Sequence, residues 1–267
     1  MARPAHLPDF KNPPLEEVVL GVQFSAIPGY MSVFSHEVWG LFQATHPKVS
    51  EHPMLSPNFE SFGGGNPQPS LQFQMGPAPT GSRQWFSTIE GNDLIQFQAD
   101  RFVANWRKQA TSPEYPRFEG ISRAFEENLR KLNEYASTRF GAPLAVNQAE
   151  ISYINIIPVD DFSDATHWFK LWDNGEISIE NLNINFDEVV KDENAKPFAR
   201  LKHHIQSVFS TDGSRKAFRL SLTFIGKPNS SDINGAMNFV RMGRERIVTR
   251  FGVITTEKAQ SSWERLS

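Results

Sequence analysis

The 267-residue sequence contains no cysteine. Disulfides, thiolate nucleophiles, iron–sulfur clusters and cysteine-based zinc sites are therefore excluded, and nothing indicates a secreted, disulfide-linked scaffold. A strong charge of either sign is missing too, because 27 basic residues stand against 30 acidic ones and the formal net charge is -3. This balance argues against a general binder of polyanions, although it is compatible with a local basic stripe.

Long apolar stretches are also missing. The sequence has no run of about 18 apolar residues, and its beginning, MARPAHLPDFKNPPLEEV, lacks the apolar core of roughly 7 to 15 residues that a signal peptide needs. We therefore expect a cytoplasmic protein with no membrane partner. Phenylalanine, in contrast, is abundant: there are 22 of these side chains in a chain that is 39% hydrophobic, which is enough to build a sizeable core.

The first half of the sequence predicts a mixture of strands and helices. A strand-like segment, LEEVVLGVQFS, precedes a helix over residues 30–45, where apolar side chains recur at helical spacing. Prolines and three consecutive glycines predict a flexible loop over residues 46–80. A three-stranded meander follows, formed by an alternating strand at residues 71–75, by RQWFSTI and by LIQFQADRFVANWRK, with a hairpin turn at residues 90–93. A long helix with one apolar stripe begins near Phe118 and ends near Gly141, a residue suited to a C-cap.

The second half of the sequence repeats this order. We expect a strand over residues 146–158, a short helix over 166–172, strands over 177–190, 199–210 and 216–225, and a long helix over 231–252. Asp232 or the preceding serine can cap the long helix. A capping threonine predicts a final short helix that docks through Trp263.

The two halves predict an α+β fold. Both long helices end in the same four residues, Thr-Arg-Phe-Gly, at 138–141 and 249–252, which suggests an internal duplication. We therefore expect two similar β-α-β-β-β-α halves, residues 1–142 and 143–267, the second carrying the C-terminal helix, in one compact unit. Their strands would form a curved, mostly antiparallel sheet with the long helices on one face, which leaves the other face for function.

The stretch LIQFQADRFVANWRK, read as one strand, changes its apolar side midway. Either a bulge near Asp100 and Arg101 turns the strand by one residue, or the strand crosses into a region where its other face is buried. In both cases Arg101, Asn105 and Arg107 become candidates for a polar patch on the sheet.

A carboxylate, Glu150, occupies a similar position in the strand that opens the second half, on one face with Ile154 and Ile156. A buried carboxylate needs a positively charged partner, and Arg101 and Arg107 are the obvious candidates for it. The group is either a structural ion pair that fixes strand register or a patch that binds a ligand, and position alone does not separate the two.

The last long helix carries several arginines, of which Arg241 and Arg244 are candidate phosphate contacts. The alternative is a solvated helix face whose cations are favoured by the helix dipole. No nucleophile elbow, phosphate-binding loop, zinc-protease helix or dinucleotide-binding glycine pattern occurs. A non-enzymatic protein is therefore favoured over an enzyme, and we expect no cofactor, no metal and no catalytic residues.

Several segments taken together resemble a known protein type: FKNPPLEEVVLGVQF, FQADRFVANWRK, YPRFEGI, EISYINII and RIVTRFGVITT. They are similar to a sporadically distributed family of conserved hypothetical bacterial proteins with an FKNPPLEEV-type N-terminus, over nearly the whole chain. The resemblance implies no activity and no catalytic residues. The sequence departs from the family's pattern at Asn155-Ile156, where a histidine would follow the asparagine.

The missing catalytic motifs and the phenylalanine-rich, near-neutral composition favour a non-enzymatic protein-binding function. The family's sporadic distribution fits a regulatory role, such as neutralising a toxin or assisting a defence system. An alternative is a nucleic-acid-binding accessory protein that uses the curved sheet and the basic helix. A second alternative is a small-ligand cavity between the sheet and the helix at residues 118–136, where Arg101, Asn105 and Glu150 would converge.

Overall fold

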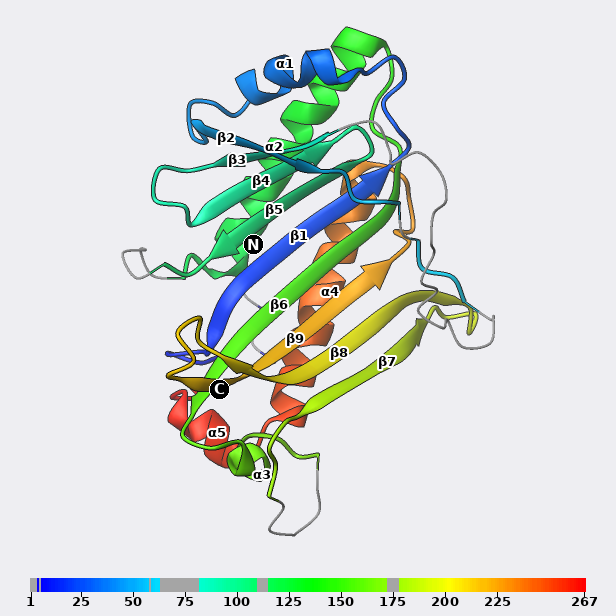
Figure 1. Ribbon diagram of the computed structural model, residues 1–267. Coiled ribbons are helices and arrows are strands. Elements are labelled where there is room, and N and C mark those ends of the chain that lie inside the picture. Colours follow the sequence, from blue (N-terminus) through cyan, green and yellow to red (C-terminus); the bar gives the residue numbers. More distant parts are fainter. Residues whose placement is uncertain (1–3, 5, 58, 63–81, 110–114, 172–177) are drawn as a thin grey trace, which may run out of the picture.

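A computed structural model describes residue 4 and residues 6–57, 59–62, 82–109, 115–171 and 178–267. The fold is α+β and is organised around one antiparallel sheet of nine strands, in the order β2-β3-β4-β5-β1-β6-β9-β8-β7 (Figure 1). The strands of the first half are β1 (Leu15–Phe24), β2 (Lys48–Pro53), β3 (Ser82–Ser87), β4 (Asp93–Gln98) and β5 (Arg101–Arg107). Those of the second half are β6 (Val146–Val159), β7 (Asn183–Lys191), β8 (Pro197–Phe209) and β9 (Lys216–Gly226).

Five α-helices occur in the described part of the chain: α1 (Ser35–Gly40), α2 (Arg117–Phe140), α3 (Ala165–Trp168), α4 (Ile233–Ile254) and α5 (Glu257–Ser262). Three predicted capping residues, Gly141, Asp232 and Thr256, are confirmed, whereas α4 continues to Ile254, past the end expected at Gly252. Gly141 ends α2 in the left-handed conformation, at φ 70°. At the start of α4 the Asp232 side chain accepts a hydrogen bond from the N–H of Gly235, and at the start of α5 the Thr256 side chain accepts one from the N–H of Ala259. None of the helices in these residues combines the length and the apolar character needed to cross a bilayer.

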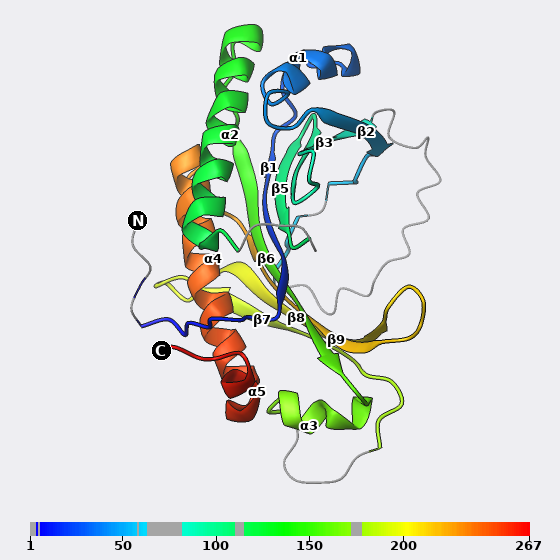
Figure 2. The same cartoon turned by 90° about the vertical axis from the view of Figure 1, so that its left-hand side faces the viewer.

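The two long helices lie side by side on one face of the sheet (Figure 2). The buried Phe102 of β5 contacts Phe125 of α2 at a ring distance of 5.8 Å and Phe42, just beyond α1, at 5.9 Å. Helix α4 approaches β6 and β9 so closely that a Cβ atom added at Gly243 would lie 2.5 Å from Ile151 Cγ2. This face carries the apolar core.

The stretch LIQFQADRFVANWRK forms a hairpin, so the prediction of one long strand with a bulge or a crossing is wrong. Strands β4 and β5 pair antiparallel, Gln98 opposes Arg101, and Ala99 and Asp100 form the turn. The apolar side changes at this turn because the chain reverses there. Ile95 and Phe97 of β4 and Phe102 of β5 therefore all face the helices.

Other boundaries also differ from expectation. The meander of the first half has four strands, because residues 48–53 within the expected loop pair with β3 as the edge strand β2. The helix expected over residues 30–45 is a 3-10 turn at Ser32–Phe34 followed by the short helix α1. Strand β7 begins at Asn183, later than expected, and the strand predicted over residues 71–75 lies outside the described residues.

The strand order is similar in the two halves. From the centre outwards the first half runs β1-β5-β4-β3 and the second runs β6-β9-β8-β7, with β2 added at the first edge. Strands β1 and β6 pair antiparallel where the halves meet. The duplication itself stays a prediction.

Candidate functional site

The face of the sheet opposite α2 and α4, called the open face below, carries the predicted site residues on β5 and β6. Val22 opposes Phe102, whose ring packs on α2, so the next residues, Gln23 and Arg101, point to the open face. By the same alternation Gln148 and Glu150 of β6 point there. The structure therefore places Arg101 and Glu150 on the side of the sheet away from α2 and not between sheet and helix.

Asn105 and Arg107 belong to a line of hydrogen bonds that crosses β1, β5, β4 and β3. The Glu17 Oε1 atom accepts from Asn105 Nδ2 at 2.7 Å and from Arg107 Nη2 at 3.2 Å. The Asn105 Oδ1 atom accepts from Gln96 Nε2 at 2.8 Å, and the Gln96 Oε1 atom accepts from Arg83 Nη1 at 3.0 Å. These hydrogen bonds link side chains across the four strands, and Arg107 takes Glu17 as its ion-pair partner.

Aromatic groups continue this line to the edge of the sheet. The Arg83 guanidinium lies 5.3 Å from the centre of the Trp85 ring, and the His52 ring of β2 stacks on the same indole at a centroid distance of 3.9 Å. A cation and two flat rings of this kind form an amphipathic surface suited to contact with other molecules.

Glu150 lies between two cations of the open face. Burial raises the pKa of Glu150, and the charges of Arg101 and Lys202 oppose this rise. Arg101 itself donates to Gln23 Oε1 at 2.6 Å. The carboxylate covers Gly21 of β1, where an added Cβ would lie 2.7 Å from Glu150 Oε1, so glycine is required for this side chain to lie flat on the sheet.

Replacing Glu150 by glutamine should change the dependence of stability on pH. Because the folded-state pKa of Glu150 is raised, this group contributes stability below its unfolded pKa near 4.5, and that contribution is lost as pH rises through the folded pKa. Glutamine has no such titration. Relative to the unmodified protein, the free energy of unfolding of Glu150→Gln, measured by urea titration, should therefore increase as pH rises from the unfolded pKa of 4.5 through the raised folded pKa. A difference that stays constant over this range would contradict the assignment.

One segment of the chain crosses the open face. It comprises residues 54–57 and 59–62, follows β2, and is called the covering segment below. The side chain of Gln98 bonds both main-chain groups of Leu55, with its Oε1 accepting from the N–H at 3.1 Å and its Nε2 donating to the carbonyl oxygen at 3.0 Å. Arg101 Nη2 donates to the Ser56 carbonyl oxygen at 3.3 Å.

The far end of the covering segment is held by β6 and β8. Gln148 Oε1 accepts from the Glu60 N–H at 2.9 Å, and Arg200 Nη2 donates to the Ser61 carbonyl oxygen at 2.7 Å. The Glu60 carboxylate, 9% exposed, forms ion pairs with Arg200 Nε at 2.6 Å and Lys202 Nζ at 2.5 Å. Side chains of the sheet therefore bind the main chain of an extended segment at both ends.

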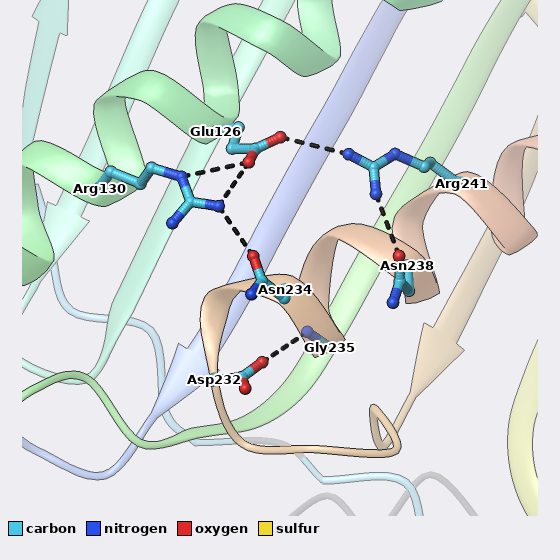
Figure 3. Close-up of polar contacts among 7 residues, drawn as sticks. All are labelled: Glu126, Arg130, Asp232, Asn234, Gly235, Asn238 and Arg241. Carbon is cyan, nitrogen blue, oxygen red and sulfur yellow. Dashed lines mark hydrogen bonds and ion pairs between the residues drawn. The ribbon is translucent and has the colours of Figure 1, made fainter. Parts of the chain in front are cut away.

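The two candidate phosphate contacts lie on the helix side of the molecule. Arg241 donates to Glu126 of α2 and to Asn238, while Arg130 donates to the same carboxylate and to Asn234, so these groups join α2 to α4 (Figure 3). Arg244 is buried beside Glu119. The structure does not bring either arginine near Arg101 or Glu150.

Sequence reasoning missed Glu17 and Glu60, the two carboxylates that pair with open-face cations. Glu17 opposes Arg107 directly, a pairing that depends on the register between β1 and β5. Glu60 lies within the region expected to be a flexible loop, and no local pattern indicates its partners. Among the described residues no group of three or more histidine, aspartate or glutamate side chains could hold a metal ion.

Comparison with known proteins returned no match: no protein-family model and no curated protein sequence is similar to this chain.

Proposed function

We propose that the protein is a non-enzymatic binding protein that holds a polypeptide partner on its open face. One observation carries the proposal: Gln98, Arg101, Gln148 and Arg200 already bond the main chain of the covering segment. Main-chain N–H and carbonyl groups occur in every polypeptide, so side chains arranged in this way suit an extended partner segment as well.

The open face continues beyond these residues. Ser152, His204 and Gln206 are partly exposed, and each can form hydrogen bonds with a partner. Such polar groups spread over adjacent strands suit a large and adaptable contact better than the enclosed pocket of a small ligand.

Charge pairing favours a polypeptide over a nucleic acid. Three cations of the open face, Arg107, Arg200 and Lys202, are bound to the carboxylates of Glu17 and Glu60. A phosphate backbone would have to displace these carboxylates and would meet their negative charge. Nucleic-acid binding is therefore the second candidate.

The resemblance to the sporadic bacterial family adds a proposal about role. A regulatory function, such as neutralising a toxin or assisting a defence system, rests on that resemblance alone. The similar strand order outward from β1 and from β6 supports the proposal that the two halves arose by duplication. Such a duplication would explain how one wide face is assembled from two short units.

Adding a long cation to the open face should abolish partner binding. We expect Ser152→Arg to lose the partner that the tagged protein retains from its host, because Ser152 is partly exposed at the middle of this face. Thr138→Arg makes the same charge change on the exposed side of α2 and should retain the partner. The measurement is the stoichiometry of the partner after purification of each variant, with circular dichroism to verify folding. Gln206→Arg repeats the test if Ser152→Arg does not fold.

Two results would count against this function. If Ser152→Arg and Thr138→Arg retained the partner equally, the partner would have to bind outside the open face. A labelled oligonucleotide that binds at low salt, loses affinity steeply as salt rises and binds Ser152→Arg at least as tightly as the unmodified protein would favour the nucleic-acid alternative.

A further inference from the structure

A second candidate site lies on the helix side of the sheet, independent of the open face. It is a cavity of about 440 Å³ between the N-terminal segment, the beginning of α2, the middle of α4 and strands β1 and β6. Its walls are largely apolar and include the side chains of Phe10, Leu15, Phe118, Ile247 and Phe251. The volume lies within the range of small-molecule sites.

Arg244 brings a positive charge into this apolar cavity. It is 6% exposed, and its guanidinium lies 5.3 Å from the centre of the Phe118 ring. Its Nη2 atom reaches Glu119 only at 3.4 Å, and its Nε atom has no hydrogen-bond partner among the described residues. A buried guanidinium nitrogen that lacks an acceptor, as this Nε atom does, is costly unless another group supplies one.

Two tyrosine hydroxyls and one amide line the cavity with Arg244. Burial raises the pKa of Tyr115 well above its ordinary value, and burial also raises the pKa of Tyr153, which hydrogen-bonds to Tyr115 and Arg244. Both hydroxyls therefore stay protonated at neutral pH and can donate. The Asn155 amide is fixed by its bond to the Leu220 carbonyl oxygen.

The first turn of α2 meets the same cavity. Its N-cap residue, Pro116, supplies no side-chain hydrogen bond to the helix, so the N–H groups that begin this 24-residue helix lack the usual side-chain acceptor. Arg117 has a positive φ of 61°, a strained conformation for a residue with a side chain. The helix dipole places partial positive charge at this end.

We propose that the cavity binds a small organic carboxylate, with the carboxylate on Arg244 and Tyr153 and the apolar body between Phe118, Ile247 and Phe251. The guanidinium and the hydroxyl supply charge-assisted and neutral donors, and the phenylalanine and isoleucine side chains bury hydrocarbon. A group with one negative charge suits this surrounding better than a phosphate, because Glu119 and Asp9 already neutralise part of the charge of Arg244 and Arg117.

The probes are 3-phenylpropionate and octanoate, each compared with its neutral amide, and inorganic phosphate in a separate arm. We expect at least one of the acids to raise the melting temperature of the full-length protein, by an amount that grows with the logarithm of its concentration above Kd, whereas its amide does not. Stabilisation by acid and amide alike, by inorganic phosphate alone, or by neither acid would overturn the proposal.

Substitutions locate the binding. Arg244→Gln should weaken the affinity for the active acid by about 10-fold, while Arg241→Gln, one turn away on α4 and outside the cavity, should change it by less than about 2-fold. Isothermal titration calorimetry measures both. If Arg244→Gln does not fold, Tyr153→Phe removes one donor and keeps the ring, and should weaken binding by about 3-fold or more. Unchanged affinity in the folded Arg244 or Tyr153 variant would refute the assignment.

Discussion

Replacing Phe102 by alanine should lower the free energy of unfolding by about 3 to 5 kcal/mol. The Phe102 ring is 0% exposed and lies between Phe42, next to α1, and Phe125 of α2. Alanine would leave a cavity where helix α2, the turn after α1 and the sheet meet, and the close-packed Phe42 and Phe125 rings can move in only partly to fill it. Urea unfolding monitored by circular dichroism measures the loss.

The matched control is Phe209→Ala at the end of β8. Phe209 is 59% exposed and contacts Phe162 only through an edge-to-face ring pair, so the same substitution should cost less than about 1 kcal/mol. Equal losses in the two variants would mean that the junction of α2 with β5 is not the centre of the core. A large loss at Phe102 alone would establish that its ring belongs to the centre of the core.

The chain reversal at Ala99-Asp100 is the part of the fold that could not be predicted from the sequence. The helices α2 and α4 and the long strand β6 were predictable because their apolar spacing continues over several turns or pairs and their ends carry capping residues. The turn at Ala99-Asp100 carries no glycine or asparagine, and neither residue has a positive φ. It is held by distant groups, since the Asp100 and Ala99 carbonyl oxygens accept from the N–H groups of Phe24 and Ile27. No local pattern encodes such contacts.

The site shows the same limit. The sequence placed Arg101, Asn105, Arg107 and Glu150 among polar positions of a sheet, and alternation alone justified that prediction. Their partners depend on register and on chain crossing. The pairing of Arg107 with Glu17 follows from one residue of register between β1 and β5. A shift of that register by one residue would have turned Glu17 toward the helices.

Replacing Glu60 by alanine should release the covering segment from the open face. Glu60 is the anion shared by Arg200 and Lys202, and its loss would leave two partly buried cations without this partner, at a cost of up to about 3 kcal/mol. Among the described residues, the segment is otherwise held by its bonds to Gln98, Arg101, Gln148 and Arg200 and by the Phe62 ring, which lies 5.0 Å from the Arg200 guanidinium, so local opening should precede global unfolding.

The measurement that separates these events is hydrogen exchange at the amide of Leu55, which donates to Gln98. We expect Glu60→Ala to speed its exchange by about 100-fold, the factor that corresponds to roughly 3 kcal/mol. Amides in the centre of β6 should change little. Glu264→Ala removes an exposed ion pair with Lys11 and should leave the exchange of Leu55 unaltered. Equal acceleration at Leu55 and in β6 would show that Glu60 supports the whole fold and not the segment.

Release of the segment also bears on the proposed function. Gln98, Arg101 and Gln148 can bond either the covering segment or a partner's main chain, but not both at once. A partner that uses these groups must displace the segment, so its apparent affinity is reduced by the cost of that displacement. Glu60→Ala removes part of this cost and should therefore tighten binding of such a partner. Unchanged affinity in this variant would place the partner on the remaining part of the open face, around Ser152 and Gln206.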